Sequence, residues 1–126
     1  MDLNIAAGGK IVVEGLTPQP VEFGRLRMTD LADLTAAIPG DSRFVTVYEL
    51  ARYAETLTGC DRVLLAARRR VEPGADDAWV ASLGSLLQRV KIAQVVMAES
   101  LTTGEDEVLL AEADAEGSGG KARGKK

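Results

Sequence analysis

Apolar residues recur at alternating spacings of four and three along residues 75–101. The stripe consists of Trp79, Leu83, Leu86, Val90, Ala93 and Met97. This spacing predicts one long amphipathic helix, the longest in the chain, which packs against several neighbours. Its apolar face is widened by Val80, Leu87, Val95 and Val96. Asp76 or Asp77 can cap its N-terminus. Gly84 lowers the helix propensity, which leaves open a kink or a split of the helix near Gly84 or Ser85.

Two short extended stretches precede the helices. The first, IVVEG at 11–15, is β-branched, and VEFGRLRM at 21–28 alternates apolar and polar positions after a proline-rich turn. Together they predict a β-hairpin. Because a lone hairpin is marginal in water, it must pack on the helices or join a neighbouring subunit's sheet. Residues 1–9 are small and polar, and we expect them to be frayed.

The next helix is predicted at 29–40, capped by Thr29 or Asp30 and stopped by Pro39–Gly40. Its inner face consists of Leu31, Leu34 and Ile38.

A further helix starts at a capping-box pattern formed by Thr46 and Glu49, with Val45 and Leu50 as a hydrophobic staple. We expect Gly59 to end this helix. Its inner face is predicted to contain Val47, Leu50, Ala54 and Leu57, with Tyr53 beside them.

Asp61 can cap another helix, RVLLAARRR, whose core positions are Val63, Leu64 and Ala67. Arg68–Arg70 would face the solvent, and we favour that interpretation over phosphate binding. The fold class is therefore α+β and mainly helical, a short N-terminal hairpin followed by about four helices. One domain is expected over residues 1–104, followed by a flexible tail at 105–126 that is acidic and then rich in Gly and Lys.

Composition narrows the function classes. The 126 residues carry a net charge of −4, which argues against generic binding to nucleic acid or anionic membrane. There is no histidine and only one cysteine, so neither an internal disulfide nor a cysteine zinc site is expected. No stretch is predicted to be a signal peptide or to span a bilayer.

Nothing in the sequence indicates catalysis, and we expect no enzyme activity, metal or cofactor. The pairs Asp30 with Asp33 and Asp76 with Asp77 are explained better by helix capping than by acid–base chemistry. Cys60 lies near a helix start, which can lower a thiol pKa, but a partly buried structural thiol is the default. The candidate binding residues are apolar positions of the long helix, which could instead be core: Trp79, Val80, Leu83, Leu86, Leu87 and Val90.

VEFGRLRMTDLADL at 21–34 resembles the opening of the phage tail assembly chaperone family of contractile-tailed phages, through an Arg-rich extended segment and the leucine helix that follows it. The matching residues are Arg25, Leu26, Thr29, Asp30, Leu31 and Leu34. Leu57, Thr58 and Gly59 also fit that family's leucine–threonine–glycine step between helices, and 76–87 is similar to its last core helix.

The resemblance implies a protein that covers apolar segments of the tape measure protein in the cytoplasm of the bacterial host until tail tube subunits dock. The implied partners are the tape measure protein and the tail tube protein, and a homo-oligomer is compatible with this role. The alternative is a structural subunit of the particle, such as a head–tail connector or neck protein.

Overall fold

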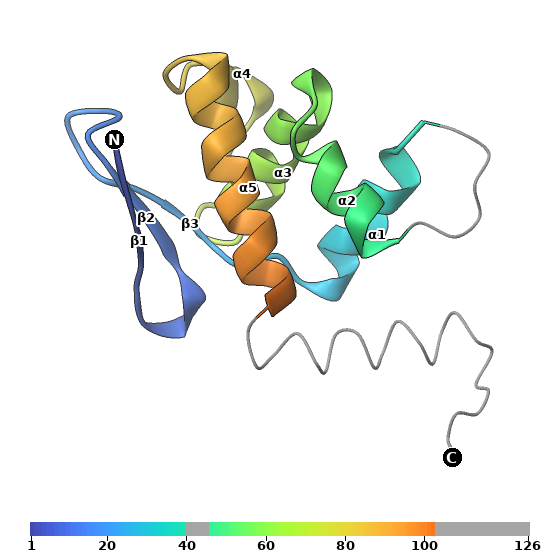
Figure 1. Cartoon of the computed structure of the whole chain (residues 1–126). Coiled ribbons are helices and arrows are strands. Elements are labelled where there is room, and N and C mark those ends of the chain that lie inside the picture. Colours follow the sequence, from blue (N-terminus) through green and yellow to red (C-terminus); the bar gives the residue numbers. More distant parts are fainter. Residues whose placement is uncertain (40–45, 103–126) are drawn as a thin grey trace.

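A computed structural model describes residues 1–39 and 46–102. Within them, a three-stranded antiparallel sheet in the order β1–β2–β3 lies to one side of five α-helices (Figure 1). The strands are β1 (Asp2–Ile5), β2 (Ile11–Glu14) and β3 (Val21–Phe23). The helices are α1 (Met28–Ala37), α2 (Val47–Tyr53), α3 (Leu57–Arg69), α4 (Asp77–Ala81) and α5 (Leu86–Thr102). The predicted fold class, α+β and mainly helical, is confirmed. None of these helices is long and apolar enough to cross a membrane.

The sheet contains the predicted hairpin and one strand more. β2 pairs with β3, with Val12 opposite Glu22. The prediction that residues 1–9 are frayed is wrong, because β1 pairs along β2 with Leu3 opposite Val13. Gly8 and Gly9, with φ of 82° and 80°, form the turn between these strands, a conformation that only glycine adopts freely.

The strand over 21–28 is shorter than predicted because its backbone turns from the sheet to the helices. Beyond Phe23, the Gly24 N–H donates to the Ala67 carbonyl of α3 at 2.9 Å. The Leu26 N–H then donates to the buried Ser100 hydroxyl of α5, also at 2.9 Å. The segment is thus anchored to α3 and α5 while the buried sheet face packs on them. That face consists of Ile11, Val13, Val21 and Phe23.

The predicted helix at 29–40 is α1, which buries Leu31 and Leu34. Its N-cap is Arg27 rather than Thr29 or Asp30. The Asp30 carboxylate instead accepts the Arg27 N–H at 2.9 Å.

The capping box at the start of α2 is confirmed. The Thr46 N–H donates to Glu49 Oε1 at 2.9 Å, and the Glu49 N–H donates to Thr46 Oγ1 at 3.1 Å. Val45, the other half of the expected staple, lies outside the described residues. Leu50, Tyr53 and Ala54 are buried as predicted, whereas Val47 and Leu57 are 41% and 71% exposed.

Gly59 does not end α2, and Asp61 does not cap α3. The Thr56 hydroxyl accepts the Gly59 N–H at 2.9 Å, so α3 starts at Leu57 and contains both residues. This earlier cap ends α2 at Tyr53. The inward face of α3 is as predicted, with Val63, Leu64 and Ala67 fully buried.

The prediction of one continuous helix over 75–101 is wrong, and the split that was left open is present. Gly84 adopts a φ of 53° between α4 and α5. The Ser85 N–H donates to Gln88 Oε1 at 2.8 Å, and the Gln88 N–H donates to Ser85 Oγ at 3.2 Å. This reciprocal pair is a second capping box, which starts α5 as a new helix. Asp76 caps α4 by accepting the Trp79 N–H at 2.9 Å.

Candidate protein-binding surface

The residues predicted to bind a partner divide between the core and the surface. Val80 and Leu83 are 1% and 2% exposed, so both lie in the core and offer no contact surface. Trp79 and Val90 are partly buried against that core. Leu86 and Leu87 are 37% and 64% exposed, because the break at Gly84 turns the start of α5 away from the stripe.

Trp79 has a structural role. Its ring packs against Phe23, with centroids 6.1 Å apart, and the Arg68 guanidinium lies over it at 4.7 Å. Arg68 also donates to the Glu22 carbonyl at 2.8 Å and to the Glu72 carboxylate at 2.6 Å. The expectation that Arg68 faces the solvent is therefore wrong. This arginine ties β3, α3 and α4 together.

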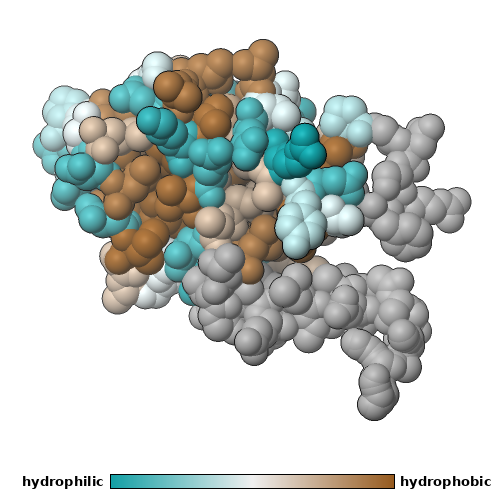
Figure 2. Space-filling model, viewed as in Figure 1, coloured by the Kyte–Doolittle hydropathy of each residue, from teal (hydrophilic) through white to brown (hydrophobic). Residues whose placement is uncertain are grey.

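An exposed apolar edge lies where α3 and α5 begin. Arg89 Nε donates to Asp61 Oδ1 at 2.9 Å, which holds the early turns of the two helices together. Leu57 precedes Asp61 by one turn, and Leu86 and Leu87 precede Arg89. We call Leu57, Leu86 and Leu87 the helix-start edge. Apolar side chains gather over this end of the molecule (Figure 2).

The outward face of α3 forms the floor of an open groove of about 900 Å³, with α1 and α4 as its walls. At about 1.5 Å per residue, the α3 floor from Leu57 to Arg70 is about 20 Å long. The apolar lining consists of Leu34, Ala37, Leu57, Leu65, Ala66 and Ala81. We call this the α3 groove. It meets the helix-start edge at Leu57, which belongs to both.

Charged side chains line the rest of the α3 groove. Arg70 makes a two-pronged ion pair with Asp30, at 2.8 and 2.9 Å, and this hydrogen bonding raises the Arg70 pKa. By contrast, four charged side chains have no ion-pair partner among the described residues. They are Asp33 on α1, Asp77 on α4, and Arg62 and Arg69 on α3.

The sequence predicts the inward face of α3 but not this groove, and it places Leu57 on the inner face of the preceding helix. Helical spacing does not group Leu57 with Leu65, because Leu57 lies seven residues, about two turns, before the buried Leu64 and therefore on the same side of α3. The two walls could not be predicted, since they depend on where α1 and α4 pack.

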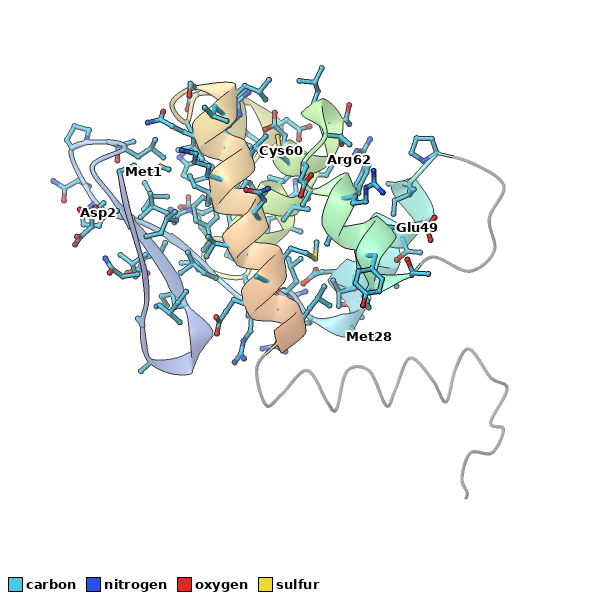
Figure 3. The ribbon with its side chains drawn as sticks, viewed as in Figure 1. Met1, Asp2, Met28, Glu49, Cys60 and Arg62 are labelled. Atoms are coloured by element: carbon cyan, nitrogen blue, oxygen red, sulfur yellow. The ribbon has the colours of Figure 1, made fainter. Side chains whose placement is uncertain are left out.

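Cys60 is fully buried in the first turns of α3, beside α5 (Figure 3). Burial raises the pKa of its thiol from 9.0 to about 11, and the neighbouring Asp61 carboxylate acts in the same direction. The sulfur donates weakly to Asp61 Oδ1 at 3.5 Å. The position of Cys60 near the start of α3 therefore does not lower the pKa of its thiol. We interpret the thiol as structural. In the described residues, no cluster of His, Cys, Asp and Glu could hold a metal.

The Cys60 pKa predicts a specific loss of stability in alkali. Between pH 9 and about 11 the unfolded chain releases the thiol proton while the folded chain keeps it. The contribution to stability is complete below pH 9 and is lost as the pH rises towards 11. Urea unfolding at pH 8 and pH 10 should therefore show a larger drop for the natural chain than for Cys60→Ala. Equal drops would contradict the buried thiol.

Comparisons with protein-family models, with curated protein sequences and with solved structures return no match for this chain.

Proposed function

We propose that this chain is a phage tail assembly chaperone that binds helical apolar segments of the tape measure protein and keeps them from aggregating. The observation that carries this proposal is the α3 groove, which opens at one end onto the helix-start edge. A groove between helices is a common docking site for an amphipathic helix. The proposal places the protein in the cytoplasm of the bacterial host, with no enzymatic role.

The residues that carry the family resemblance build one side of this groove. Leu34 lines it, and Asp30 pairs with Arg70 at its border. Leu26 and Leu31 lie in the core beneath. The resemblance thus covers part of the α1 wall of the groove and the core beneath it, whereas most of the lining comes from α3.

Shallow apolar contacts suit a chaperone that must later release its client to tail tube subunits. A long helical protein with exposed apolar faces aggregates unless those faces are covered. Many weak sites along one client give strong but reversible coverage. Leu57 and Leu87, at 71% and 64% exposed, are available for such contacts without any rearrangement.

The test is co-expression with the tape measure protein, followed by a pull-down with the full chain. We expect the natural chain to keep the client soluble and to retain it between 50 and 500 mM salt, because apolar contacts depend little on salt. Leu57→Glu combined with Leu87→Glu should weaken binding at least about tenfold. Tyr48→Glu is the matched control, because Tyr48 is 78% exposed but lies on α2, outside the groove lining and the helix-start edge.

Binding that survives the double substitution, or is lost equally with Tyr48→Glu, would contradict the proposed surface. The rival function, a head–tail connector or neck subunit, makes a different prediction. A structural subunit remains in purified particles at a fixed copy number, whereas an assembly chaperone is absent from them. Mass spectrometry of purified particles separates the two.

A further inference from the structure

The lining of the α3 groove has a charge arrangement that specifies its occupant. Two arginines on the floor, Arg62 and Arg69, lie seven residues apart with Leu65 between them. Seven residues are about two helical turns, so these three positions form one line along the outward face of α3. Their order is basic, apolar, basic.

The walls have the opposite charge. Asp33 projects from α1 and Asp77 from α4, and both are exposed members of the groove lining. The other carboxylates of the groove are already neutralised, Asp30 by Arg70 and Asp61 by Arg89. The unpaired charge is therefore basic along the floor and acidic on both walls, within the described residues.

Small side chains leave room for a helix between the walls. Ala37 on α1, Ala66 on α3 and Ala81 on α4 all line the groove. Packed helix axes lie about 8–10 Å apart, and the shorter distances require small residues at the contact. A floor of about 20 Å would contact roughly four turns of a docked helix.

We propose that the α3 groove selects an amphipathic helix with two acidic residues one heptad apart in its apolar seam and with Lys or Arg on both flanks. The acidic residues would pair with Arg62 and Arg69, and an apolar residue between them would pack on Leu65. The basic flanks would face Asp33 and Asp77. Where the docked helix is taken to be a tape measure segment, this inference rests on the proposed function. The preference of the groove for a helix of this pattern rests on the lining residues alone.

Two synthetic helical peptides of identical composition test this charge rule. The first has Glu in the seam and Lys on both flanks, and the second exchanges the Glu and Lys positions. Fluorescence anisotropy with the full chain at 100 mM salt should show the first peptide binding about tenfold more tightly. Each exposed ion pair is worth up to about fivefold in affinity, so two or more pairs suffice for this preference.

Neutralising the walls should reduce that preference. Asp33→Asn with Asp77→Asn is expected to weaken binding of the first peptide about three- to tenfold, leaving the second unchanged or slightly tighter. Asp2→Asn with Glu14→Gln removes the same charge from exposed positions of the sheet, outside the groove lining, and should change neither affinity. Circular dichroism checks that both double variants keep the native helix content.

Equal affinity for the two peptides, no binding of either, or a preference unaffected by wall neutralisation would overturn the charge rule. These outcomes are separable from the pull-down with the tape measure protein. A successful pull-down together with equal peptide affinities removes only the charge rule. A failed pull-down together with the expected peptide preference removes only the tape measure protein as client.

Discussion

Leu83→Ala is expected to lower the free energy of unfolding by about 2–5 kcal/mol. Leu83 is 2% exposed in the turn between α4 and α5, and its N–H bonds to the Val80 carbonyl at 3.0 Å. Truncation removes buried methyl groups and leaves a cavity. Neither the short α4 nor the capped start of α5 can shift far enough to fill it. Urea unfolding followed by circular dichroism measures the change.

Leu86→Ala is the matched control, since it removes the same atoms from a neighbouring position of the same sequence pattern. Leu86 is 37% exposed, so the loss should be under about half of that for Leu83. The sequence pattern predicts equal, large losses at both positions. Similar losses at the two positions would mean that the chain is helical through Gly84 in solution.

Local signals in the sequence predicted the elements that depend on neighbouring residues. The capping box at Thr46, the cap at Asp76 and the hairpin over 11–28 each need only a few adjacent side chains. The structure contains all three for that reason, although the strand predicted over 21–28 ends earlier, at Phe23. The buried face of α3 also follows from helical spacing alone, because Val63 and Leu64 lie four and three residues before Ala67 and so share one face with it.

The features that the sequence did not predict are those in which two local sequence signals favour different structures. Over 75–101, helical periodicity passes through Gly84 without interruption, yet Ser85 and Gln88 form a capping box that starts a new helix. The capping box prevails because Gly84 adopts a left-handed conformation at little cost. At the N-terminus, Gly8 and Gly9 fit either a frayed end or a tight turn, and pairing of β1 with β2 decides for the turn.

The candidate surface was predictable only in part, because an apolar stripe has the same appearance whether it faces a core or a partner. Val80 and Leu83 are core, whereas Leu86 and Leu87 are exposed, and only the break between α4 and α5 distinguishes them. The α3 groove depends on three helices that are far apart in sequence. Its lining therefore appears only once α1 and α4 are packed on α3.

Gly59→Ala is expected to destabilise the fold by about 3 kcal/mol, although alanine is normally the better helix former. A Cβ atom at this position would overlap the Tyr53 carbonyl oxygen and lie 2.6 Å from Thr56 Oγ1. That carbonyl accepts the Thr56 N–H at 3.1 Å and the Thr56 hydroxyl at 2.8 Å, which together form the turn between α2 and α3. The added methyl group must open this turn and displace the cap of α3.

Gly74→Ala provides the control, because a Cβ atom there meets nothing within 4 Å and the backbone is not left-handed. Its expected effect is between zero and a gain of about 1 kcal/mol, through reduced entropy of the unfolded chain. Thermal unfolding of the two variants should thus move in different directions or differ by several degrees. A Gly59→Ala variant as stable as Gly74→Ala would show that α2 and α3 are not joined by the close turn at Tyr53 and Thr56. The start of α3 would then lie elsewhere, and the helix-start edge would lose Leu57.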